Sequence, residues 1–292
     1  MTRRGIVAYL VAFAIAFAAG LGYAFLTNDG APAADGPLEV TVNGAFGAPV
    51  TIKVSGLPTA GQTTTKILER NGGDTIADGD PVLLRTTSFD SKTGNEVTEY
   101  DTGRLVVTTA NEAGLGTLAP FVVGQSEGSR VLVVRPGLTS DDTHAEIVVV
   151  DLLNTTARGT PAALPSGQGL PGIAVNADGT PKVTKGSGEV TALNVAVQIP
   201  GKGQQVGSDD VVVVQYLLAD AAGKVTESTW DGAGPAIVKV SDVFEGLKAG
   251  IVDQRVGSRV VIVAPAGDAK GDKDVTVVVD ILAVLAEDDL AK

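Results

Sequence analysis

The chain of 292 residues contains no cysteine and a single histidine, His144, which removes several classes of chemistry. Without cysteine it can form no disulfide, thiolate zinc site, iron–sulfur cluster or cysteine nucleophile. One imidazole also cannot build a multi-histidine metal centre. We therefore expect neither a cofactor nor a metal site.

Clusters of positive charge are missing as well. The chain carries 22 lysine and arginine residues against 34 aspartate and glutamate residues, a formal net charge of −12. Because binding to a phosphate backbone depends on clustered positive charge, this composition argues against a nucleic-acid partner. Aromatic residues make up only 4%, but 44% of the residues are hydrophobic, which is enough for ordinary folded cores.

One long apolar run is present, near the amino terminus. Arg3 and Arg4 precede residues 6–26, a run of 21 residues without charge. As a helix this run would extend about 31 Å, enough to cross the hydrocarbon core of a bilayer. Positive charge before it predicts that the rest of the chain faces outward, while Ala-Pro-Ala at residues 31–33 is typical of a signal cleavage site.

We therefore predict that residues 1–34 form either a signal peptide or an N-terminal membrane anchor. If the segment is uncleaved, residues 6–26 contact the membrane. In both cases the folded part is extracytoplasmic, either secreted or anchored to the outer face of the cytoplasmic membrane.

An internal repeat is the strongest organisational pattern. Residues 124–137 and 253–266 share seven identities in fourteen positions at an offset of 129, and the same offset places VVVDLL at 148–153 on VVVDIL at 277–282. A segment between the copies is rich in Pro, Gly, Ser and Thr and lacks periodicity. We predict a first domain at residues 35–154, a linker at 155–172 and a second domain at 173–292.

Short valine-rich runs predict buried antiparallel strands, among them residues 211–217, 259–263 and 275–285. Residues 243–251 have helical spacing, with Asp242 in position to cap the first turn. Their first-half counterpart, residues 111–122, contains two glycines and a proline, so its helix should be shorter or distorted. The predicted fold class is α+β and mostly β, with one short helix against the sheet of each half.

Arg130 and Arg259, equivalent in the repeat, are expected to pair with carboxylates on an exposed strand face.

The second half resembles an FKBP-type peptidyl-prolyl cis–trans isomerase, in the exported tandem form found in actinobacteria. The resemblance rests on Tyr216 at a strand end and on four segments: TESTWDGAGP at 226–235, VFEGL at 243–247, VDQRVGSRVVIVAPA at 252–266 and DVTVVVDIL at 274–282. It implies two FKBP-like domains, each an antiparallel half-barrel sheet around one short helix, the first being degenerate. It also implies an apolar pocket that binds the proline ring of X-Pro bonds in exported polypeptides.

The resemblance assigns nine residues to the substrate pocket and gives none of them an acid–base role. They are Tyr216, Thr226, Glu227, Ala236, Val243, Phe244, Leu247, Lys270 and Val277, with Trp230 at a possible rim. Five of these positions carry rings in the family but hold Thr226, Ala236, Leu247, Lys270 and Val277 here. Since rings add to binding beyond their buried area, their loss predicts weak binding of proline.

Two functions remain open from the sequence. One is an extracytoplasmic FKBP-type prolyl isomerase or folding helper of low activity, since a desolvated pocket can favour the twisted amide without a nucleophile or a proton shuttle. The alternative is a non-catalytic tandem FKBP-like module that binds an envelope partner or acts as a spacer. An open apolar groove would favour the first, and a pocket filled by Leu247 or Lys270 would favour the second.

A hydrolase motif is also present but stands in the wrong context. Residues 124–128 fit G-x-S-x-G, and Asp141, Asp142 and His144 follow in the hydrolase order. A nucleophile elbow requires strand, turn and helix in that order, whereas Ser126 leads into a predicted strand. We therefore expect His144 to be a turn residue before a strand.

Overall fold

The computed structural model describes residues 37–56, 61–97, 103–136, 144–167, 169–176, 179–186, 189–232, 234–286 and 289. The predicted leader or anchor at residues 1–34 lies outside these ranges. Within them, no helix has the length and apolar character needed to span a membrane.

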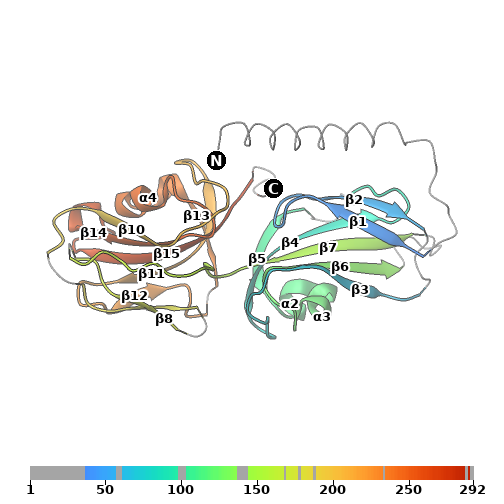
Figure 1. The fold of residues 1–292 in the computed structure, drawn as a ribbon, viewed down its shortest axis with the longest axis horizontal. Helices are drawn as coiled ribbons and strands as arrows, with labels where there is room; N and C mark the ends of the chain where they lie inside the picture. Colours follow the sequence, from blue (N-terminus) through green and yellow to red (C-terminus); the bar gives the residue numbers. More distant parts are fainter. Residues whose placement is uncertain are drawn as a thin grey trace, which may run out of the picture.

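The first half is built on a five-stranded antiparallel sheet in the order β3-β6-β7-β4-β5 (Figure 1). The strands are β3 (Thr64–Arg70), β4 (Pro81–Asp90), β5 (Leu105–Thr109), β6 (Ser129–Pro136) and β7 (Ala145–Leu153). Three short helical segments pack on one face: α2 (Glu112–Leu115), η1 (Gly116–Leu118) and α3 (Ala119–Val122). A hairpin of β1 (Glu39–Asn43) and β2 (Thr51–Ser55) packs on the other. The interrupted helix confirms the distortion predicted for residues 111–122.

The second half contains a sheet in the order β10-β14-β15-β11-β12, with β13 also paired to β11. The strands are β10 (Asn194–Ile199), β11 (Val211–Ala219), β12 (Val225–Ser228), β13 (Ala236–Lys239), β14 (Arg259–Ala264) and β15 (Val275–Val284). One face packs against α4 (Glu245–Ile251), which follows the short η2 (Val240–Asp242), and the other against a hairpin of β8 (Ile173–Val175) and β9 (Pro181–Val183). A further short turn, η3 (Ala266–Asp268), follows β14. The order β10-β14-β15-β11 matches β3-β6-β7-β4 of the first half, and β13 pairs with β11 as β5 pairs with β4, as the sequence repeat predicts.

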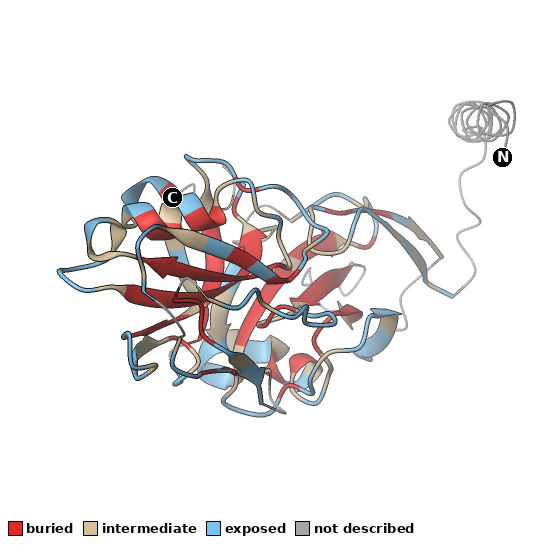
Figure 2. Cartoon of the chain, turned by 60° about the vertical axis from the view of Figure 1, so that its left-hand side comes forward, coloured by how far each residue is buried: buried red, intermediate tan, exposed pale blue. Residues whose placement is uncertain are grey.

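Both sheets are covered on both faces, which explains their valine-rich sequences. In β14, Val260 and Ile262 belong to the core beneath α4, whereas Val261 and Val263 belong to the core beneath the hairpin. A strand buried on both sides has no polar alternation. Buried residues accordingly run along the central strands (Figure 2).

The observed strands confirm the predicted ones in the second half, but the start of the helix differs. Helix α4 begins at Glu245, and its N-cap is Phe244, which makes no side-chain capping bond. Asp242 lies one turn earlier, in η2, where its Oδ1 accepts a hydrogen bond from Ser241 Oγ at 2.9 Å. Asp242 is therefore not the cap of this helix.

The expectation that Arg130 and Arg259 lie on an exposed face is wrong. Arg259 is 1% exposed and Asp280, opposite it on β15, is 0% exposed. Arg259 Nε and Nη2 donate to the two carboxylate oxygens of Asp280 at 2.6 and 2.7 Å. Arg130 and Asp151 form the same bidentate pair in the first half, at 2.6 and 2.7 Å.

Each arginine is buried because a hairpin covers that face of the sheet. Its guanidinium group donates to backbone carbonyls in the turn of this hairpin. Arg130 Nη1 and Nη2 donate to the carbonyls of Gly44 and Ala45 at 3.0 and 2.9 Å, between β1 and β2. Arg259 Nη2 donates to the Gly179 carbonyl at 2.9 Å, between β8 and β9. The repeated Arg and Asp motifs thus attach a hairpin to each sheet, which is a structural role.

The predicted linker, residues 155–172, packs against the sheets near its two ends, while residues 158–163 between them are exposed. Thr156 and Ala157 are 6% and 8% exposed, and the Ala157 amide donates to Asp280 Oδ2 at 2.7 Å. Leu170, at 7%, belongs to the core beneath the second hairpin. The segment has irregular backbone, and it is anchored to the second half at Ala157 and Leu170.

The two halves share an apolar seam. It consists of Leu83 and Leu105 from the first half and Val213, Leu282, Ala283 and Leu285 from the second. Beside it, Arg85 Nη2 donates to Asp289 Oδ2 at 3.0 Å, and these side chains are 6% and 1% exposed. The halves are therefore joined by packing as well as by the chain.

Candidate functional site

A groove of about 490 Å³ opens in the second half between α4 and the sheet. Its walls are mostly apolar, with four polar or charged side chains. It is lined by Val214, Tyr216, Leu218, Glu227, Val238, Asp242, Val243, Phe244, Leu247, Ile251, Lys270 and Val279.

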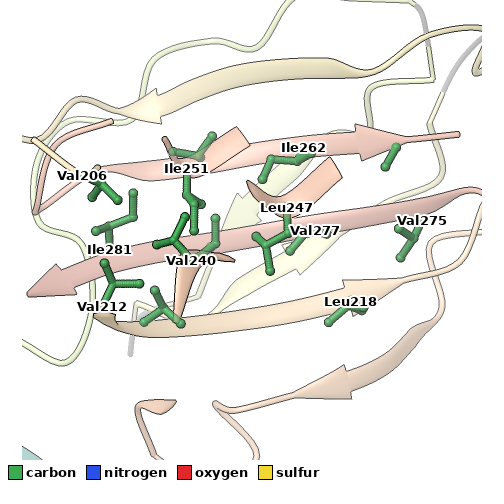
Figure 3. Packing of buried hydrophobic residues seen from close by; sticks show 14 residues of the cluster. Val206, Val212, Leu218, Val240, Leu247, Ile251, Ile262, Val275, Val277 and Ile281 are labelled. Atoms are coloured by element: carbon green, nitrogen blue, oxygen red, sulfur yellow. The ribbon is translucent and has the colours of Figure 1, made fainter. Parts of the chain in front are cut away.

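Local periodicities explain most of the groove. Val214, Tyr216 and Leu218 alternate along β11 and therefore face the same side of the sheet. Leu247 and Ile251 lie one turn apart on α4, directly over the sheet (Figure 3). Together they form the floor on which a ligand would rest.

Two glycines let α4 approach the sheet closely. A Cβ on Gly250 would lie 2.2 Å from Ile262 Cδ1, and one on Gly246 would lie 2.6 Å from Ala264 Cβ. Any larger residue at either position would lift the helix from β14. The depth of the groove therefore depends on these two positions.

The polar end of the groove is a chain of three side chains. Tyr216 Oη donates to Glu227 Oε1 at 2.5 Å, and Lys270 Nζ donates to Glu227 Oε2 at 3.1 Å. These two hydrogen bonds lower the pKa of Glu227 below its usual value. Burial, reinforced by the Glu227 carboxylate, raises the pKa of Tyr216 to about 12. The phenol is therefore neutral and the carboxylate charged at neutral pH.

Six of the nine predicted pocket residues line the groove: Tyr216, Glu227, Val243, Phe244, Leu247 and Lys270. The other three do not. Thr226 precedes Glu227 on β12, so its side chain takes the opposite face and donates to the Leu218 carbonyl at 3.3 Å. Ala236 pairs with Val214 at the start of β13, and Val238, two residues on, reaches the groove instead.

Val277 lies on the predicted face of β15, but two residues away from the position that lines the groove. Val277 and Val279 both belong to the core beneath α4 and are 0% and 1% exposed, but Val279, which pairs with Tyr216, is the one that lines the groove. An alignment of motifs identified the strand face but not the position along it.

The remaining lining residues were missed in the sequence, and some carried a usable signal. Val214 and Leu218 lie two residues from Tyr216 on either side, and Ile251 lies four residues after Leu247. Strand and helix periods alone would have added these three. Val238 lies on β13, two residues after Ala236, and Asp242 lies in η2 before α4, where only the tertiary structure brings it to the groove.

Trp230 lies away from the groove. It lines a separate cavity, and its ring packs over the Arg259 guanidinium with 5.8 Å from Cζ to the ring centroid. It therefore covers the buried ion pair of β14 and β15. The rim position predicted for Trp230 is wrong.

The hydrolase motif has no catalytic geometry. Ser126 lies between α3 and β6, so the order is helix, turn and strand, the reverse of a nucleophile elbow. His144 directly precedes β7, and its Nδ1 lies 2.7 Å from Asp90 Oδ2. Asp141 and Asp142 lie outside the described residues. Within the described ranges, no three His, Cys, Asp or Glu side chains gather to hold a metal.

The topology and groove define a mostly β protein with two antiparallel sheets, each packed against a short helical layer. No protein-family model and no curated protein matches the chain. Among solved structures, FkpA from Escherichia coli is 20% identical with a TM-score of 0.29, covering 39% of this chain and 52% of its own. The match thus spans about half of the FkpA chain.

Two further structures are similar at the same level. The three FKBP domains of wheat FKBP73 match at 16% identity and a TM-score of 0.30, covering 77% of this chain and 95% of theirs. A multi-domain immunophilin from Arabidopsis thaliana matches at 14% identity and a TM-score of 0.30, covering 32% and 43%. TM-scores this low carry no argument about function. The functional proposal therefore rests on the groove.

Proposed function

We propose that the chain is an extracytoplasmic FKBP-type peptidyl-prolyl isomerase or folding helper that acts on X-Pro bonds with low activity. The open groove is the observation that carries this proposal. Leu247 and Lys270, which a filled pocket would have placed inside it, are among the residues that line it, and the groove keeps a volume of about 490 Å³.

The groove suits a proline ring because it removes the ring from water without offering reactive groups. Val243 and Phe244 stand at the start of α4, above the aliphatic floor. The resonance barrier of about 18–20 kcal/mol falls when the surroundings favour the twisted amide over the planar one. Tyr216 and Glu227 are already bonded to each other, so we give them an orienting role at the rim.

The direct test is a protease-coupled isomerisation assay of the full chain on Ala-Leu-Pro-Phe-type peptides. Acceleration over buffer at micromolar protein is the expected result. Binding of such peptides without acceleration would support the non-catalytic alternative. Neither acceleration nor binding would contradict both readings of the groove.

Replacing Leu247 with tryptophan should restore one missing ring and strengthen the binding of an X-Pro peptide in the groove. A ring pair adds roughly 0.5–1.5 kcal/mol beyond area burial, or about two- to tenfold in affinity for an X-Pro peptide. The same assay and a peptide-binding titration measure it. Leu247→Met is the matched control, since it keeps the volume without a ring, and equal affinities for both variants would show that the ring position does not contact proline.

Peptide affinity should be independent of pH between about pH 6 and pH 9, because neither Tyr216, whose pKa is raised to about 12, nor Glu227, whose pKa is lowered, changes charge in that range. Glu227 has a lowered pKa in the folded chain, so its bonds to Tyr216 and Lys270 persist above the unfolded pKa and are lost only as the pH falls through the lower folded value. Tyr216 keeps its proton up to about pH 12. A binding midpoint near neutrality would contradict this assignment.

A non-catalytic tandem module is the second candidate. Among the groove-lining residues, only Tyr216 and Phe244 carry rings, and Thr86 takes the place of Tyr216 in the first half. Such a groove could hold a partner segment without stabilising the twisted amide. The coupled assay separates this candidate from the first.

The extracytoplasmic location is part of the proposal. It is supported by Arg3, Arg4 and the uncharged run at residues 6–26. Its substrates would then be exported polypeptides containing X-Pro bonds. Protease added to intact cells should digest an anchored chain at the outer face, and full protection would contradict this location.

A further inference from the structure

The groove is lined by one carboxylate that no described lysine or arginine neutralises. Its charged lining residues are Glu227, Asp242 and Lys270. Lys270 Nζ lies 3.1 Å from Glu227 Oε2, so these two charges compensate each other. Asp242 pairs with no lysine or arginine among the described residues, and its Oδ1 accepts only from Ser241 Oγ at 2.9 Å. The lining therefore keeps one negative charge in excess.

The lysines that are closest to Asp242 in the chain do not line the groove. Lys239 ends β13, just before η2, and Lys248 lies on α4. Asp242 itself is exposed, so an incoming group can reach it without displacing a protein side chain. A ligand can therefore supply the cation that the groove lacks.

The surface beside Asp242 favours a long side chain over a small cation. Val243 and Phe244 follow Asp242 directly and line the same groove. Lysine and arginine bury an aliphatic stem along apolar surface while their charged ends remain in water. Such a stem can lie on Val243 and Phe244 and bring its cation to Asp242. A metal ion, in contrast, needs several oxygen ligands and gains nothing from an apolar wall.

We propose that the groove prefers X-Pro segments with a lysine or arginine next to the proline, the cation lying against Asp242. This inference rests on the proposed function, because it takes an X-Pro segment as the ligand. Asp242 is then a specificity-determining residue, which binds the side chain beside the proline and not the proline ring. The formal charge of −12 on the whole chain acts in the same direction, since it attracts basic segments at longer range.

Matched peptides isolate the contribution of the charge. Titration calorimetry at low salt compares the binding of Ala-Lys-Pro-Ala to the full chain with that of Ala-norleucine-Pro-Ala, in which norleucine keeps the lysine stem without its ammonium. A second pair carries lysine or norleucine after the proline. The lysine peptide of at least one pair should bind about two- to fivefold more tightly, as expected for an exposed ion pair. In 1 M salt, where charges are screened within about 3 Å, this advantage should disappear.

Two variants locate the preference. Asp242→Asn keeps an oxygen that can accept from Ser241 but removes the charge, so the ratio of lysine to norleucine affinity should fall by about two- to fivefold. The ratio cancels effects that are common to both peptides. Glu245→Gln is the matched control, because it removes an exposed carboxylate three residues later that does not line the groove. It should leave the ratio nearly unchanged.

The outcomes separate this inference from the proposed function. Binding of the norleucine peptides without a lysine advantage in either pair would overturn the inference and leave the proposed function standing. A lysine advantage that survives Asp242→Asn, or that Glu245→Gln removes equally, would also overturn it. No binding of any of the peptides would contradict the groove as an X-Pro site and overturn both.

Discussion

Replacing Asp280 with asparagine is expected to lower the free energy of unfolding by about 3–5 kcal/mol, because it leaves the buried Arg259 guanidinium without its counter-ion. Both side chains are at most 1% exposed, so solvent screens almost none of this loss. The variant also weakens the bond from the Ala157 amide to Asp280 Oδ2, which ties the connecting segment to β15.

Urea unfolding followed by Trp230 fluorescence measures this effect directly, since the Trp230 ring lies over Arg259. Asp209→Asn is the control, because it removes an exposed carboxylate from the same half. Asp151→Asn should reproduce the loss in the first half, where the same bidentate pair holds the β1–β2 hairpin. A loss below about 1 kcal/mol would place the pair among weak surface ion pairs and contradict its buried role.

Replacing Leu83 with alanine should destabilise both halves together. Leu83 is 1% exposed and packs in the seam with Val213 and Leu282 of the second half. Truncating a buried leucine costs about 2–5 kcal/mol, depending on how far the site relaxes. Because the seam is shared, the unfolding transition reported by Trp230 in the second half should shift although the mutation lies in the first.

The control for this variant is Val106→Ala on the adjacent strand β5, where the side chain is 40% exposed. That change should alter stability by less than about 0.5 kcal/mol. Circular dichroism, which follows both sheets, should give the same midpoint as fluorescence for Leu83→Ala. An unchanged Trp230 transition would show that the halves unfold independently.

Sequence reasoning succeeded where the pattern is local. Alternating and continuous valine runs predicted β11, β14 and β15, and Gly114, Gly116 and Pro120 predicted the broken helix of the first half. Six pocket residues line the groove, and three of them, Val243, Phe244 and Leu247, do so because neighbouring motif positions stay together at the start of α4. Val277 does not line the groove although Val279, on the same face of β15, does, because the position of the groove along the strand depends on tertiary packing.

The errors share one cause, which is the covering of one segment by another that is distant in the chain. The sequence predicts an exposed Arg259 because charged residues on strands usually are exposed, whereas its Gly179 acceptor comes from the β8–β9 turn, 80 residues earlier in the chain. The motif neighbours of Trp230 predict a position at the groove, but its ring lies over Arg259 and lines a cavity together with residues of the first half.

The sequence by itself determined the repeat, the strand-rich composition of each half, the glycines that bring α4 onto the sheet and the shortage of rings in the pocket. The tertiary structure alone decided that the groove is open, that the repeated Arg and Asp side chains are buried, and that the two halves share a seam. Strand and helix periods are properties of neighbouring residues, whereas burial and cavity volume depend on which remote surfaces meet.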